Sequence, residues 1–148
     1  LKNPRIYSLP MNMEDPWIKT RVDNLAGYLG RIRRAAEEYG AMTAVLSVPD
    51  GPYVNKPAFE GVAKVGYIPD AEWMTAQNAD EGIRRAAAKA ELPFFTASPA
   101  FTARETEPDL FYELDGHLTP KGHALYAEGI APEIERLIAP AVPREGGT

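Results

Sequence analysis

Cysteine is absent from this chain of 148 residues. Its absence excludes a disulfide framework, a thiol nucleophile and a zinc–thiolate centre, but it does not assign a cellular compartment. Long hydrophobic runs are missing too. No apolar stretch approaches the roughly 20 residues that cross a bilayer, and no basic-then-apolar leader opens the sequence. The sequence therefore predicts no membrane span.

Basic residues are fewer than acidic ones. The chain has 16 Lys and Arg against 21 Asp and Glu, a net charge of −5 at pH 7, so no nucleic-acid partner is expected. The length suits one globular domain, which we expect over residues 1–139, with a flexible tail over 140–148. Because the chain begins at Leu1 rather than at Met, we expect a processed product or a piece of a larger protein.

Residues 16–39 carry the clearest helix pattern. Asp15 and Pro16 are typical of an N-cap and a first helical residue, and apolar residues then recur at helical spacing until Gly40. Gly40 is typical of a helix C-terminus, where a left-handed residue often follows. The alanine-rich residues 79–90 predict a second helix.

Two short apolar runs, residues 42–48 and 92–96, are interpreted as buried strands. Helices alternate with them, so the sequence predicts an α/β fold in which a parallel sheet is flanked by helices, the first helix packing on the sheet. Two strands alone make a marginal sheet. Further strands are therefore expected, either within residues 50–78 or in sequence outside this chain. Short helical turns are also expected at 58–63 and 71–76.

The chain has only two histidines. One belongs to Asp115-Gly116-His117, and residues two apart in an extended segment point to the same side. Asp115 can then orient the His117 ring while the other ring nitrogen works as a base. Thr119-Pro120 predicts a helix start just beyond. The sequence thus predicts an acid–base pair on a loop at the end of the sheet, where α/β folds often place their sites.

Residues 111–134 resemble the last conserved block of the SGNH, or GDSL-type, hydrolases, in which the catalytic Asp and His precede the final helix. In that family a glycine follows the histidine by five residues, a spacing that His117 and Gly122 match, and a Gly122-His123 pair is common there. The resemblance implies the C-terminal part of a flavodoxin-like SGNH hydrolase fold. It also implies that His117 and Asp115 belong to a Ser-His-Asp triad.

The spacing of the acid departs from the family pattern. Many members have Asp-x-x-His, whereas this chain has Asp115-x-His117. Glu113, on the same side of the segment, therefore remains an alternative orienting acid.

The lack of a nucleophile block is a larger departure from the family pattern. This chain has no counterpart of the family's Gly-Asp-Ser block, of its oxyanion-hole glycine or of its Asn-containing block. The chain has three serines, Ser8, Ser47 and Ser98, and none stands in a glycine-flanked nucleophile turn. We interpret all three as structural. The resemblance then implies that the nucleophilic serine lies outside this chain.

A two-stranded sheet is not covered on all sides. An incomplete sheet leaves an apolar face exposed along Val45, Leu46 and Phe94. We expect a second polypeptide segment, or self-association, to cover that face.

Two functions follow as hypotheses. The first is an SGNH-type serine esterase, or an acyl or acetyl transferase, acting on a small-molecule or carbohydrate ester without a cofactor. This chain would supply its acid–base half and would be inactive alone. By family resemblance such a protein would belong to the cell envelope or be secreted.

The second hypothesis is a non-catalytic module that binds a partner or a glycan, with His117 vestigial. His123 is expected to pack or cap the last helix. A metal site formed by Asp115, His117 and His123 is disfavoured, because their spacing matches no standard ligand pattern.

Overall fold

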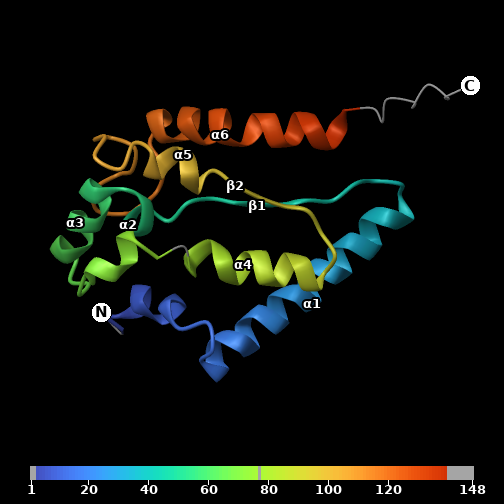
Figure 1. Cartoon of the computed structure of the whole chain (residues 1–148), viewed down its shortest axis with the longest axis horizontal. Helices are drawn as coiled ribbons and strands as arrows, with labels where there is room; N and C mark the ends of the chain where they lie inside the picture. Colours follow the sequence, from blue (N-terminus) through green and yellow to red (C-terminus); the bar gives the residue numbers. More distant parts are fainter. Residues whose placement is uncertain (1–2, 77, 140–148) are drawn as a thin grey trace, which may run out of the picture.

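The computed structural model describes residues 3–76 and 78–139 (Figure 1). Two short strands lie at the centre, with helix α6 along one side of them and helix α4 along the other. The elements, with η marking a 3-10 helix, are η1 (Ile6–Met11), α1 (Pro16–Glu38), β1 (Val45–Ser47), α2 (Gly51–Val54), α3 (Lys56–Lys64), η2 (Ala71–Met74), α4 (Asn78–Lys89), β2 (Phe94–Thr96), α5 (Ser98–Thr102) and α6 (Pro120–Ile138). The predicted tail at 140–148 lies outside the described residues.

Strands β1 and β2 pair in parallel, with Val45 opposite Phe94 and Ser47 opposite Thr96. This arrangement confirms the predicted neighbouring parallel strands flanked by helices. Each strand has three residues, fewer than the apolar runs suggested, and Met42 at the start of the first run is exposed. Apolar character marks where a strand can form, whereas backbone pairing decides where it begins.

The expectation of further strands within residues 50–78 is wrong for the described part of this segment. Its regular structure is helical, and α3 and η2 confirm the two predicted helical turns. Local capping explains the outcome. The Asn55 side chain accepts the Ala58 N–H at 3.1 Å at the start of α3, and the Asp70 side chain accepts the Glu72 N–H at 3.0 Å at η2.

Helix α1 begins as predicted, because the Asp15 carboxylate accepts the Trp17 N–H at 2.8 Å. Its predicted packing on the sheet is wrong. The apolar face of α1, with Ile18 and Val22, joins a cluster with Ala86 of α4, and α4 lies between α1 and the strands (Figure 1). An amphipathic helix needs an apolar partner, and here a second helix provides it.

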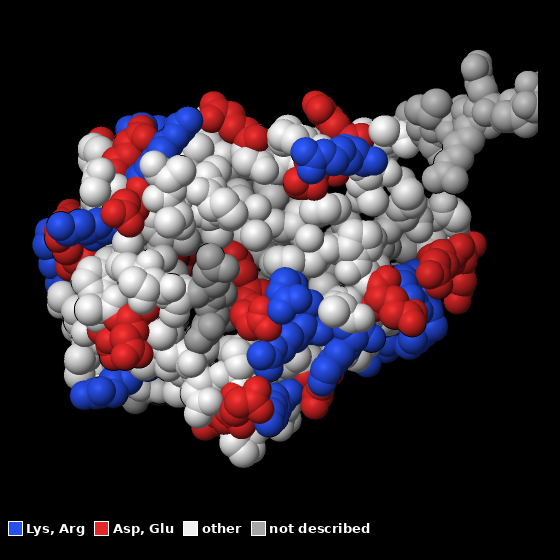
Figure 2. All heavy atoms as spheres, in the orientation of Figure 1, with Lys and Arg blue, Asp and Glu red and all other residues white. Residues whose placement is uncertain are grey.

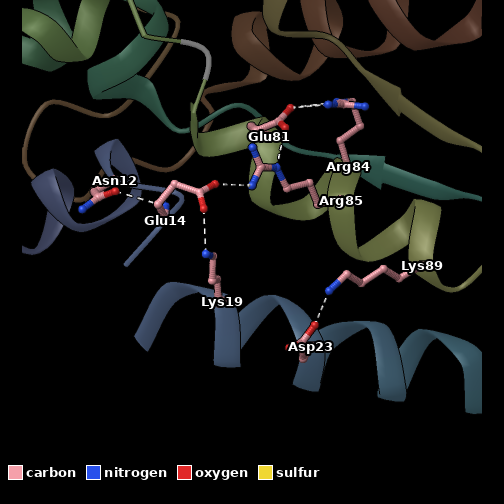
Figure 3. A network of polar contacts seen from close by, with 8 residues as sticks. All are labelled: Asn12, Glu14, Lys19, Asp23, Glu81, Arg84, Arg85 and Lys89. Atoms are coloured by element: carbon pink, nitrogen blue, oxygen red, sulfur yellow. Dashed lines mark hydrogen bonds and ion pairs between the residues drawn. The ribbon is translucent and has the colours of Figure 1, made fainter. Parts of the chain in front are cut away.

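Ion pairs also connect α4 to α1 and to the segment just before it (Figure 3). Glu14, just before α1, pairs with Lys19 at 2.6 Å and with Arg85 of α4 at 3.4 Å. Within α4, Glu81 pairs with Arg84 and Arg85, each at 2.6 Å, and so holds Arg85 toward Glu14. Acidic and basic side chains accordingly lie close together over α1 and α4 (Figure 2). Because such exposed pairs contribute at most about 1 kcal/mol each, the apolar cluster holds the helices and the charges align them.

The main core is a second cluster, separate from the one between α1 and α4. Trp73, Phe101 and Leu110 are fully buried there, and Leu125 and Ile130 of α6 pack in the same cluster. This core fixes the segment before α6, because Leu110 anchors its start and α6 anchors its end.

The start of α6 is confirmed at the predicted cap. The Gly122 N–H donates to Thr119 Oγ1 at 3.1 Å. The helix approaches the preceding segment so closely that a Cβ on Gly122 would lie 2.1 Å from the Leu110 carbonyl oxygen. Glycine at this position therefore allows α6 to dock against the loop before it.

Candidate functional site

The predicted acid–base loop is a tight turn held at both ends. An antiparallel bridge joins Phe111 to Leu118, and the Tyr112 N–H donates to the His117 carbonyl at 2.8 Å. Gly116 closes the turn with φ +71, a left-handed conformation that suits glycine. The backbone on both sides of the pair is thus fixed to buried residues.

Asp115 and His117 lie side by side in this turn. Asp115 Oδ1 accepts the His117 N–H at 2.9 Å and lies 3.5 Å from His117 Nδ1. The first distance is an ordinary hydrogen bond, but its donor is the backbone of His117 and not the ring. The second is longer than a normal N–H···O bond. The side chains are 83% exposed for His117 and 60% for Asp115, so the ring is open to solvent.

Glu113, the alternative acid, points to a different partner. Its carboxylate forms an ion pair with Lys64 at the end of α3. Its backbone carbonyl lies so close to Gly61 of α3 that a Cβ there would come within 2.7 Å. Glu113 therefore ties the loop to α3, and Asp115 is the acid that stays beside His117.

His123 lies exposed on the first turn of α6, so the expectation that it packs against the protein is wrong. Its backbone N–H donates to the Thr119 carbonyl at 2.8 Å as part of the helix. Within residues 3–76 and 78–139, no three His, Cys, Asp or Glu side chains lie close enough together to hold a metal ion. Asp115, His117 and His123 thus form no ligand set in this part of the chain.

The three serines have structural partners. Ser47 is 2% exposed and its hydroxyl donates to Asp80 Oδ1 at 2.5 Å. Ser8 Oγ accepts the Trp73 indole N–H at 3.3 Å. Ser98 opens helix α5, and its Oγ lies 3.1 Å from Thr96 Oγ1. In the described residues none of them is hydrogen-bonded to His117, so the location of a nucleophile stays a prediction.

A large cavity lies at the carboxyl ends of the two strands. Its volume is about 1010 Å³, and its wall includes Ser47 and Thr96, the last residues of β1 and β2. The residue that follows β1, Val48, lines it as well. Open α/β sheets often bind ligands just outside the carboxyl ends of their strands. The sequence reasoning missed this cavity.

His117 and Asp115 do not line this cavity. Asp115 and Gly116 instead line a cleft of about 90 Å³. Tyr7 and Tyr67 line both spaces, and their rings meet edge to face with centroids 4.9 Å apart. The acid–base loop and the large cavity are therefore neighbours across this tyrosine pair.

Asp80 joins the two strand ends to helix α4. Its carboxylate accepts the Ser47 hydroxyl at 2.5 Å and the Thr96 hydroxyl at 2.7 Å. Asp80 belongs to the first turn of α4, where the helix dipole favours a negative charge. A hydroxyl residue at the end of each predicted strand, followed by an acid in a first helical turn, is the sequence signal that could have indicated this cluster.

Asp50 has a perturbed environment on the cavity wall. Although it is solvent-accessible, the surrounding protein desolvates its carboxylate and raises its pKa from 3.8 to about 6. Burial also raises the pKa of the nearby Tyr53 hydroxyl, and the charge of Asp50 adds to that shift. Tyr53 is buried, and its hydroxyl donates to the Tyr7 carbonyl oxygen.

Comparisons with protein-family models, curated proteins and solved structures found no match to this chain. Among the helices of the described residues, none is long and apolar enough to cross a membrane.

Proposed function

We propose that this chain is the acid–base half of an SGNH-type serine esterase or acyl transferase, with the flavodoxin-like fold that the family resemblance implies. One observation carries the proposal. The Asp115 carboxylate contacts His117 in a turn fixed at both ends, and the ring is 83% exposed where another polypeptide can reach it. A base that must accept a proton from a serine on another segment needs this accessibility.

The local geometry gives the family-like spacing a physical reason. Gly122, five residues after His117, is the position at which α6 touches the Leu110 carbonyl, where any side chain would collide. The glycine thus sets the distance between the helix and the histidine loop. This requirement supports the resemblance, because the spacing reflects packing of the whole block.

The proposed mechanism uses the two nitrogens of His117 differently. Nδ1 lies on the side of Asp115, which would hold the tautomer and stabilise the imidazolium, and Nε2 is left for the substrate side. The external serine oxygen would attack the ester carbonyl carbon and give its proton to Nε2. His117 would then protonate the leaving alcohol. Water, or an acceptor alcohol, would release the acyl group from the serine.

The open sheet supports a partner that completes the site. In the described residues β1 pairs with β2 alone, while Leu46 is 38% exposed and Val48 is 59% exposed. Val45 and Phe94 are only half-buried. An added strand would cover this edge and could carry the serine to the carboxyl end of the sheet. The partner would be a second polypeptide segment or a second copy, and the substrate a small-molecule or carbohydrate ester with no cofactor.

The non-catalytic module remains a second proposal, supported by a different observation. The Nδ1–Oδ1 distance of 3.5 Å is long for a working dyad, and the large cavity is separate from the pair. In that case the chain would bind a partner or a glycan and His117 would have no chemical role.

Assays with a chromogenic acetyl ester distinguish the proposals. The chain alone should show no turnover above buffer, and Ser47→Ala should leave this unchanged, because in the described residues no serine is hydrogen-bonded to His117. A polypeptide segment with a Gly-Asp-Ser block should bind the chain and create turnover. Binding without turnover would favour the non-catalytic module. Turnover by the chain alone that Ser47→Ala abolishes would contradict our reading of Ser47 as structural.

A further inference from the structure

The large cavity has an aromatic and aliphatic wall. Three tyrosines, Tyr7, Tyr53 and Tyr67, are among its lining residues, together with Val54 and Phe94. Behind them, fully buried Trp73 packs on Tyr7 and Tyr53 with ring centroids 5.4 and 6.1 Å away. A wall backed in this way is held in place before any ligand arrives. Its volume of about 1010 Å³ is that of a site for a small organic molecule.

The charges on the wall decide which ligand fits. Asp50, Asp80, Glu81 and Arg84 line the cavity. Arg84 is engaged by Glu81 at 2.6 Å, so these two side chains compensate each other. Asp80 accepts only neutral hydroxyl groups, and no hydrogen bond or ion pair to the Asp50 side chain exists in the described part of the chain. Among the described residues, these two cavity carboxylates thus have no cationic partner.

A carboxylate on a cavity wall with no cation beside it is stabilised by a positive charge brought to it. A divalent metal does not suit this place, because the described residues contain no group of three acidic or histidine ligands. An organic cation suits it better, since tyrosine faces attract ammonium groups and an apolar body gains from the aliphatic wall.

We propose that this cavity binds an organic ammonium ion, its charge beside Asp50 and Asp80 and its apolar body against the tyrosine wall. This site is separate from the Asp115–His117 pair and does not depend on the proposed esterase function. The two unpaired carboxylates disfavour anionic ligands, and a neutral ligand gains no charge–charge attraction from them.

The test compares 2-phenylethylammonium chloride with 2-phenylethanol, which have the same apolar body and differ in charge. Calorimetric titration of the full chain should show the ammonium ion binding at least about tenfold more tightly, the effect of one moderate cation–π or carboxylate contact. Equal affinity of the two probes, or no heat from the ammonium ion, would overturn the proposal.

Variants locate the binding. Asp50→Asn and Asp80→Asn should each weaken ammonium binding by about fivefold or more while leaving the alcohol unaffected. Glu38→Gln, at the exposed end of α1, removes the same charge from a residue that does not line the cavity and should change neither affinity. If all three variants weaken binding equally, the attraction comes from net charge and the proposed site is wrong. Circular dichroism checks that each variant is folded. The Asp50→Asn result is decisive because, in the described part of the chain, no hydrogen bond is made to the Asp50 side chain.

Discussion

Replacing Gly122 by alanine tests whether the close approach of α6 builds the histidine loop. In an exposed helix this change would stabilise the protein by up to about 1 kcal/mol, because alanine is the better helix former. Here the new Cβ would lie 2.1 Å from the Leu110 carbonyl oxygen and 3.1 Å from Leu118 Cδ2. The contact with a backbone atom cannot be relieved by rotating a side chain.

The magnitude follows from what must move. The helix would have to withdraw by about 1 Å, weakening the bond from the Thr119 N–H to the Leu110 carbonyl, now 3.1 Å. Overpacking of this kind costs about 1–3 kcal/mol and a lost hydrogen bond about 1 kcal/mol. After subtracting the gain of about 1 kcal/mol from alanine in a helix, we expect a net loss of about 1–3 kcal/mol in the free energy of unfolding.

Urea unfolding followed by circular dichroism measures this loss, and Gly27→Ala is the matched control. Gly27 lies within α1, and no heavy atom beyond its neighbours would come within 4 Å of a Cβ there. The control should be as stable as the wild type or up to about 1 kcal/mol more stable. If Gly122→Ala behaves like Gly27→Ala, α6 does not dock as described and the argument from spacing fails.

Two further variants test the surroundings of the cavity. Asn55→Ala should lower the free energy of unfolding, measured in urea, by about 3 kcal/mol. This buried amide caps α3 and also donates to the Glu105 and Glu107 carbonyls, and a loss below about 1 kcal/mol would contradict that role. Asp50→Asn tests the raised pKa of Asp50: the folded state holds this proton more tightly, so wild-type stability falls as pH rises from 3.8 to about 6. The stability of the variant relative to the wild type should therefore rise across that pH range. A difference between their urea midpoints that does not change with pH would refute the raised pKa of Asp50.

Local signals predicted the parts of the fold that depend on neighbouring residues. Asp15-Pro16 and Thr119-Pro120 marked two helix starts, because capping and proline preferences act within one turn. The turn at Gly116 brings Asp115 to His117 for the same reason.

Contacts between distant segments could not be predicted in this way. The apolar stripe with Ile18 and Val22 indicated a buried face, but α4 could not be recognised as its partner, because periodicity does not identify the surface that it meets. The cavity also depends on contacts between distant segments, because Tyr7, Asp50 and Asp80 come together only when the strands, α4 and the N-terminal segment have packed.

The most direct measurement of the central claim is the rate of acetyl-ester hydrolysis when the chain is combined with a segment that carries a Gly-Asp-Ser block. His123→Ala is the matched control, because it removes the other exposed histidine. The account predicts turnover that His117→Ala lowers by about 10²–10⁴-fold, the range of general base catalysis, and that His123→Ala leaves unchanged. Turnover that survives in His117→Ala would contradict it.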